Sequence, residues 1–117
     1  MSKSLTYSVK KDIITMEIIE TSIYTKYITE LLSDEEYKEL QSFLVEHPQS
    51  GDIIPKSGGL RKLRWKLKNS GKSGGIRNIY YYYENKHTLY MLYVYTKTKK
   101  DNLNDEELSI LKSLIKG

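Results

Sequence analysis

Residues 60–68 read LRKLRWKLK, a stretch in which apolar and basic residues alternate. Leu63, Trp65 and Leu67 occupy every second position, and cations stand between them. A period of two is typical of a β-strand that buries one face and leaves the other in solvent. The sequence therefore predicts a strand whose outer face is cationic.

Two more strands are predicted on the C-terminal side of this one. Residues 69–75 (NSGKSGG) form a loop, residues 76–84 a second strand, and residues 88–96 a third, after a turn at 85–86. Two strands joined by a tight turn form a hairpin. Tyrosine suits a sheet that is apolar on one side and wet on the other. Alternation directs half of the tyrosine run 80–83 to each face, and the sequence leaves open which half.

Two helices are predicted on the N-terminal side. Thr21 or Ser22 can cap a helix that reaches residue 31 or 32. Residues 33–36 (SDEE) form a capping box, in which the serine oxygen and the last glutamate each accept a backbone N–H. The second helix must end near His47, because Pro48 lacks an N–H and restricts the residue before it.

The order of these elements predicts the fold class. Residues 16–20 (MEIIE) form a first strand, and residues 104–107 (NDEE) cap a short closing helix. Strand, two helices, three strands and a helix make an α+β domain, with helices over one sheet face and the other face left for a ligand. We expect a single domain at residues 16–117 and an N-terminal extension of unknown order at residues 1–15.

Composition excludes several classes of protein. The chain has no cysteine and two histidines, so we expect no disulfide, no metal and no other cofactor. No apolar run approaches the ~20 residues that a membrane span requires, and the first residues lack the apolar stretch of a signal peptide. We therefore expect a cytoplasmic protein with no membrane partner.

Positive charge is concentrated in one part of the chain. The net charge is +4, yet residues 56–100 hold twelve Lys or Arg and one acidic residue, Glu84. The remaining residues hold seven basic and fourteen acidic residues, so the two parts carry +11 and −7. A region of such charge attracts polyanions, of which nucleic acid is the usual one. The cations lie in strand-like sequence and not on a basic amphipathic helix, which argues against a lipid surface.

Several blocks of sequence resemble the HigB-type branch of the RelE toxins. They are GGLRKLR (58–64), GKSGG (71–75), IRNIYY (76–81), YVYTK (93–97) and LSDEEY (32–37). The resemblance covers residues 16–115. It implies a microbial-RNase-like fold, in which two N-terminal helices pack on one face of a small antiparallel sheet and a short C-terminal helix follows. It also implies cleavage of mRNA at the ribosomal A site and neutralisation by a cognate antitoxin.

The chain departs from the family pattern at two positions. Ser73 stands where the family commonly has a cation, and Thr96 stands where it commonly has glycine. The threonine adds bulk beside Tyr95 and Lys97, two residues that we expect in the site. These departures bear on the rate of cleavage and on the identity of the acid–base pair.

Cleavage of RNA by its own 2′-hydroxyl needs a base, an acid and stabilisation of a negatively charged phosphorane. His87 and Glu84 lie near the predicted turn, away from the cationic strand. Lysine is then the remaining candidate, because neighbouring cations lower the pKa of an ammonium group. We expect the base to be Lys68 or Lys72, the phosphorane ligands Arg64 and Arg77, and the acid Lys97 or Tyr95. Further RNA contacts are expected from Arg61, Lys62, Lys66, Tyr93, Lys99 and Lys100.

Three other functions stay open. The chain could hold RNA or the ribosome without cutting, since a conventional acid–base pair is missing. It could be a decayed toxin that retains only antitoxin binding. A DNA-binding repressor is disfavoured, because no helix-turn-helix with a basic recognition helix is visible.

Overall fold

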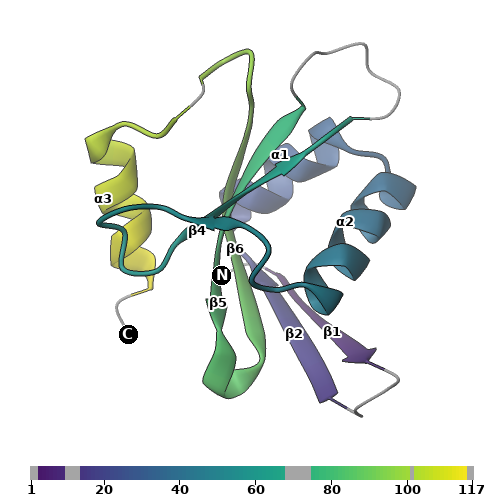
Figure 1. Cartoon of the computed structure of the whole chain (residues 1–117). Coiled ribbons are helices and arrows are strands. Elements are labelled where there is room, and N and C mark those ends of the chain that lie inside the picture. The colour runs from purple at the N-terminus through teal and green to yellow at the C-terminus, as the bar shows by residue number, and fades with distance from the viewer. Residues whose placement is uncertain (1–2, 10–13, 68–74, 101, 116–117) are drawn as a thin grey trace.

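A twisted sheet separates two helices from a third (Figure 1). The computed structural model describes residues 3–9, 14–67, 75–100 and 102–115, the first of these and residues 14–15 by their backbone alone. In sheet order, the strands are β1 (Lys3–Val9), β2 (Ile14–Glu20), β6 (Thr88–Thr96), β5 (Ile76–Tyr83), β4 (Arg61–Trp65) and β3 (Asp52–Ile53). The predicted α+β class is confirmed.

The three predicted strands of the basic region form an antiparallel meander. β4 pairs with β5, and β5 pairs with β6. The turn between β5 and β6 is the 3-10 helix Glu84–Lys86, after which His87 adopts a left-handed φ of 48°. This part of the fold agrees with the alternation seen in the sequence.

One strand pair differs from the expected antiparallel sheet. β2 runs parallel to β6, and β1 extends the sheet by pairing antiparallel with β2. Parallel neighbours require a long crossover connection. Both N-terminal helices and strands β3 to β5 lie between β2 and β6 in the chain, and they supply that connection.

The N-terminal helices follow their capping signals. α1 (Ser22–Leu31) begins after Thr21, whose side chain accepts the Tyr24 N–H, and α2 (Asp34–Glu46) begins at the predicted capping box and ends at His47. Both helices cover one face of the sheet (Figure 1). The main core lies between them and the strands, and it includes Met16, Ile18, Tyr24, Ile28, Leu40, Leu44, Leu63, Ile76, Tyr80, Leu89 and Met91.

The expectation that the second face of the sheet stays free of helices is wrong. α3 (Asp105–Leu114) begins at the predicted Asn104 cap and lies against that face (Figure 1). Leu111 packs there in a second cluster with Leu60, Ile79, Leu92 and Tyr95. Leu111 is buried by this contact and Leu108 and Ile115 are partly buried, whereas Leu114 of the same apolar stripe stays exposed. The face is therefore not left entirely for a ligand.

The tyrosine run divides between the two faces. Tyr80 and Tyr82 join the main core, whereas Tyr81 joins the second cluster. On β6, Met91 lies opposite Tyr80 and Tyr93 lies opposite Ile79, so Leu92 is an extra residue in that strand. Such a β-bulge changes the direction of the residues after it. As a result, both Leu92 and Tyr93 contact the second cluster.

Candidate nucleic-acid interface

Three neighbouring strands place two arginines and a tyrosine in one line. Arg64 of β4 lies opposite Arg77 of β5, which lies opposite Tyr95 of β6. Directly opposite residues of antiparallel strands point to the same face, with Cα atoms about 4.5–5.5 Å apart. This face is the one that carries α3, because Tyr95 belongs to the same cluster as Leu111. We call Arg64, Arg77 and Tyr95 the arginine row.

Exposure to solvent falls across the arginine row. The Arg64 side chain is exposed, whereas Arg77 is 3% exposed and Tyr95 is 4% exposed. Arg77 Nη1 donates to the carbonyl oxygen of Ile76 at 3.4 Å. A guanidinium group stays charged even when it is enclosed. The row therefore presents one accessible cation next to one enclosed cation, and the expected open cationic face holds for Arg64 but not for Arg77.

A second line of residues runs beside the arginine row. Lys97 donates its backbone N–H to the carbonyl oxygen of Gly75 at 3.1 Å. On the β4 side, a Cβ atom added to Gly75 would lie 3.0 Å from the Cα of Lys66. Gly75 thus lies between Lys66 and Lys97, and both lysines are exposed. We call Lys66, Gly75 and Lys97 the lysine row.

The lysine row has no side chain at its centre. Gly75 itself is buried, and the two lysines that flank it are exposed. Neighbouring strands are about 4.8 Å apart, so the two flexible lysine side chains can both reach one anion between them. Neither Lys66 nor Lys97 forms an ion pair with another described residue. Lysine and arginine form strong charge-assisted hydrogen bonds with phosphate. The lysine row together with Arg64 therefore suits a phosphodiester.

Two cations of β4 are engaged within the protein. Arg61 Nη1 donates to the carbonyl oxygens of Gln49 at 3.0 Å and Gly51 at 2.8 Å. Lys62 Nζ donates to Asn102 Oδ1 at 2.7 Å. Strand alternation also places Arg61 on the opposite face from Lys62. Arg61 is therefore separate from the arginine row, and its hydrogen bonds hold the loop before β3.

Lys100 joins α3 to the tyrosines of β6. Its Nζ pairs with the Glu107 carboxylate and lies 5.9 Å from the ring centre of Tyr93 and 5.8 Å from that of Tyr95. The hydrogen bond to Glu107 raises the pKa of Lys100, and the same bond lowers the pKa of Glu107. Lys100 is thus occupied by contacts within the chain at the border of the arginine row.

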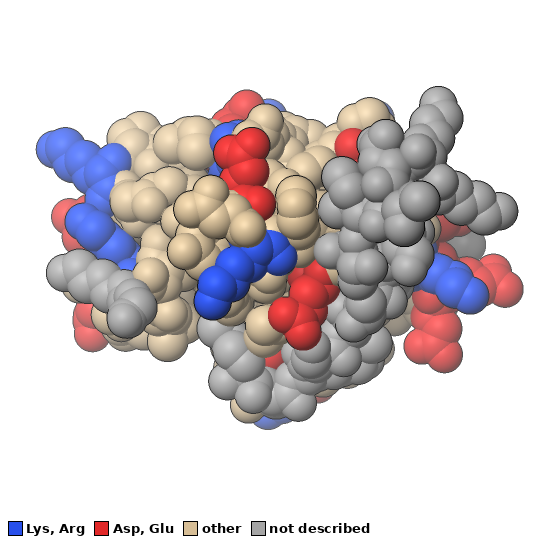
Figure 2. Space-filling view, turned by 90° about the horizontal axis from the view of Figure 1, so that it is seen from below, with Lys and Arg blue, Asp and Glu red and all other residues tan. Residues whose placement is uncertain are grey.

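The end of the molecule that carries the β5–β6 turn shows no comparable gathering of cations among its described residues. Lys and Arg are scattered there among acidic and uncharged residues (Figure 2). Glu84 and His87 belong to this turn. Tyr83 is six residues from Arg77 along β5, which corresponds to about 20 Å. These two conventional acid–base groups are therefore remote from the arginine row.

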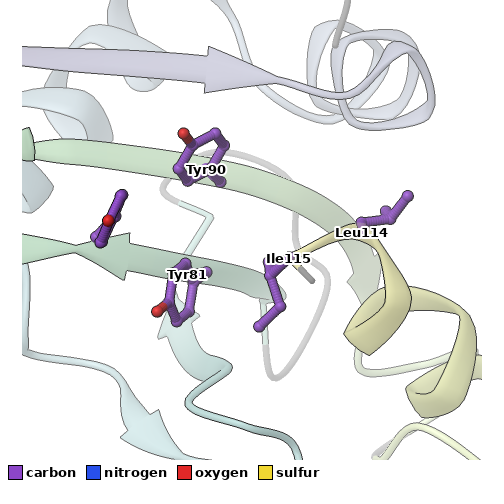
Figure 3. A pocket seen from close by; sticks show the side chains of 5 residues that line it. Tyr81, Tyr90, Leu114 and Ile115 are labelled. Carbon is purple, nitrogen blue, oxygen red and sulfur yellow. The ribbon is translucent and has the colours of Figure 1, made fainter. Parts of the chain in front are cut away.

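A hollow of about 350 Å³ lies near the C-terminal end of α3. Its walls are Tyr81, Tyr83 and Tyr90 from the hairpin and Leu114 and Ile115 from α3 and its end (Figure 3). The rings of Tyr81 and Tyr83 stack with centres 6.4 Å apart. Tyr81 is four residues from Arg77 along β5, or about 13 Å. This hollow is therefore separate from the two rows.

Helix α1 contributes residues that the sequence did not single out. A hollow of about 260 Å³ lies between α1 and β6, which we call the α1–β6 pocket, and its walls include Tyr27, Glu30, Leu31, Tyr93, Tyr95 and Lys99. The Tyr27 ring meets the Tyr93 ring edge-on, with centres 6.3 Å apart. Only the packing of α1 beside β6 brings Tyr27 to this place. No signal in the sequence around Tyr27 marks it.

The remaining predictions concern the candidate bases, metal ligands and membrane-spanning helices. Lys68 and Lys72, the candidate bases, lie outside the described residues. Within the described ranges, no three His, Cys, Asp or Glu side chains are grouped so that they could hold a metal ion. The described helices include none that is long and apolar enough to cross a membrane.

A family model and two solved structures all match this chain, and they belong to the same group of proteins. The sequence model of the family described as the RelE toxin of the RelE / RelB toxin-antitoxin system matches residues 16–117. The E. coli toxin RelE in the free state, with two arginines replaced by alanine, matches with a TM-score of 0.58 and 17% identity over 84% of this chain and 95% of that chain. The toxin–antitoxin complex RelBE of E. coli matches with a TM-score of 0.52 and 20% identity over 68% of this chain and 93% of that chain. At these identities, the structural likeness establishes the fold.

Proposed function

The chain belongs to the RelE toxin family, and from that premise we propose that it is the toxin of a type II toxin–antitoxin system that cleaves messenger RNA at the ribosome. In this proposal, residues 16–117 are the toxin domain, which acts in the ribosomal A site in the cytoplasm. The sequence blocks at 58–64 and 76–81 favour the HigB-type branch of the family.

The observation that carries the proposal is the position of the lysine row beside the arginine row. Arg64, Lys66 and Lys97 are exposed. Arg64 belongs to β4 and Lys66 follows that strand, whereas Lys97 follows β6 on the other side of Gly75. An anion between Lys66 and Lys97 can be held from both sides. Arg77 is two residues from Gly75 in the chain, and a positive charge near the anion favours a phosphorane more than the less charged ground state.

The proposed chemistry is metal-independent attack by the 2′-hydroxyl of the RNA on the adjacent phosphorus. The 2′-hydroxyl loses its proton to Lys68 or Lys72, and the bond between phosphorus and the 5′-oxygen breaks. The departing 5′-oxygen takes a proton from Lys97 or Tyr95. Lys97 is the more accessible of these two donors, because Tyr95 is 4% exposed.

A cognate antitoxin is the proposed protein partner. One of the similar structures is a toxin–antitoxin complex. The exposed cations of the two rows suit an acidic polypeptide, because complementary charge guides association. An antitoxin that lies over Arg64 and the lysine row would also block RNA.

A non-catalytic RNA- or ribosome-binding module is the second candidate. It is favoured by the distance between the arginine row and the turn that holds Glu84 and His87. Brief induction of the chain in cells, followed by primer extension on a translated message, separates the two functions. A nuclease produces breaks at fixed positions within codons, and we expect such breaks. Growth inhibition without breaks would support the binding module, and no inhibition with retained antitoxin binding would indicate a decayed toxin.

A further inference from the structure

The α1–β6 pocket adjoins the arginine row. Tyr95 is a wall of this pocket and also the residue opposite Arg77. Lys97 follows Tyr95 by two residues, a backbone distance of about 7 Å. A single-stranded RNA with a phosphate on the lysine row therefore has this pocket within reach of a neighbouring base.

The walls of the pocket suit one flat ring. Tyr27, Tyr93 and Tyr95 form a series of rings whose centres are 6.3 and 5.7 Å apart. The volume of about 260 Å³ lies just below the ~300–1,000 Å³ of pockets that hold drug-sized ligands, which suits a single base. Bases of single-stranded nucleic acid commonly stack on tyrosine.

The pocket carries two exposed groups of opposite charge. Glu30 is on the α1 side and Lys99 on the β6 side, and neither forms an ion pair with another described residue. A carboxylate only accepts hydrogen bonds, and an ammonium group only donates them. Guanine presents the matching edge, with the O6 acceptor beside the N1–H and N2–H donors. Adenine and cytosine offer a carboxylate one amino donor at that edge, and uracil offers one imino donor. Guanine alone can therefore donate two hydrogen bonds to the carboxylate.

We propose that the α1–β6 pocket binds one base of the RNA and prefers guanine, with Tyr27 as a stacking residue and Glu30 as a specificity-determining residue. The inference rests on the proposed nuclease function, because the preferred base is identified from the RNA sequence around each break. RNA is favoured over an antitoxin side chain by the contiguity of the pocket with the lysine row and by its paired opposite charges.

The experiment maps breaks across many messages after brief induction. The wild type is compared with Glu30→Gln, Tyr27→Ala and the control Glu46→Gln, which removes an exposed carboxylate from α2. We expect guanine to be enriched at one fixed position relative to the wild-type breaks. Glu30→Gln should lower that enrichment at least about fivefold, the lower end of one good contact to a base edge. Tyr27→Ala should reduce cleavage at all sites, and Glu46→Gln should change neither property.

The outcomes separate this inference from the function on which it rests. Codon-positioned breaks whose base distribution is the same in wild type and Glu30→Gln would overturn the pocket and leave the nuclease intact. A folded Tyr27→Ala protein that cleaves normally but binds antitoxin more weakly would assign the pocket to the antitoxin and overturn the inference. Absence of any breaks with the wild type would remove both proposals. Since Glu30 is exposed, its substitution should not prevent folding.

Discussion

At the scale of single residues, Gly75 links the fold to the candidate site. It has a φ of +62°, and a Cβ atom at this position would lie 2.1 Å from the backbone oxygen of Trp65. A side chain here would thus be both strained and blocked by backbone. Gly75 is buried, and the backbone of Trp65 and Lys66 occupies the place that its side chain would take. The glycine thus allows the close approach of the two chain segments that carry Lys66 and Lys97.

Gly75→Ala should be strongly destabilising. The left-handed conformation costs an L-residue about 1–2 kcal/mol, and the clash with backbone adds roughly 1–3 kcal/mol. Gly58→Ala is the matched control, because Gly58 has a φ of +76° but its added Cβ would only reach the Lys112 side chain at 3.7 Å. Urea unfolding of both variants measures the difference. Equal losses for the two variants would contradict the close contact at Gly75.

At the scale of elements, two tyrosines connect the helices to the sheet, Tyr24 buried and Tyr37 half-buried. The Tyr24 hydroxyl of α1 donates to Asn78 Oδ1 of β5 at 2.8 Å, and the Tyr37 hydroxyl of α2 donates to the Glu20 carboxylate of β2. Burial is the largest cause that raises the pKa of each tyrosine, and the charge of Glu20 contributes to both. Each hydroxyl must therefore keep its proton while the helices are packed.

These tyrosines should make the protein sensitive to alkali. Unfolded tyrosine has a pKa of about 10, so above that pH the unfolded state loses protons that the folded state retains. The unfolding free energy should then fall by about 1.4 kcal/mol per pH unit for each such tyrosine, and the contribution is fully present only below pH ~10. Between pH 10 and 11, the unfolding free energy of Tyr24→Phe should fall less steeply with pH than that of the wild type, by the contribution of one tyrosine. Urea unfolding at several pH values measures this slope. An unchanged slope would show that Tyr24 ionises in the folded protein.

Local signals in the sequence were sufficient for the helices and the hairpin. The capping boxes at Ser33 and Asn104 lie within four residues, and the alternation in β4 lies within nine. The parallel pairing of β2 with β6 and the extra residue Leu92 depend on contacts between distant segments, so no local pattern contains them. For the site, alternation correctly placed Arg64 on the cationic face. It could not show that Arg77 is enclosed, because a strand pattern gives the face of a residue but not what packs over it.

At the scale of the whole molecule, the helices cover the faces of the sheet and the exposed cations of the two rows lie at one end of its strands. α1 and α2 close one face of the sheet, and α3 packs on the other (Figure 1). The strand ends beside Gly75 carry the exposed cations, whereas the opposite end, at the β5–β6 turn, has mixed charge (Figure 2). The exposed cations Arg64, Lys66 and Lys97 therefore lie away from the β5–β6 turn.

The most direct test of this account is primer extension on a translated message with the double variant Lys66→Ala/Lys97→Ala. The control is Lys38→Ala/Lys86→Ala, which removes two exposed lysines elsewhere, on α2 and in the β5–β6 turn. With equal protein levels and similar melting temperatures, the account predicts that breaks in the message decrease at least about tenfold in the first variant, the effect of ~1.4 kcal/mol, and persist in the control. Undiminished cleavage by Lys66→Ala/Lys97→Ala would contradict the lysine row as the place where the phosphate lies.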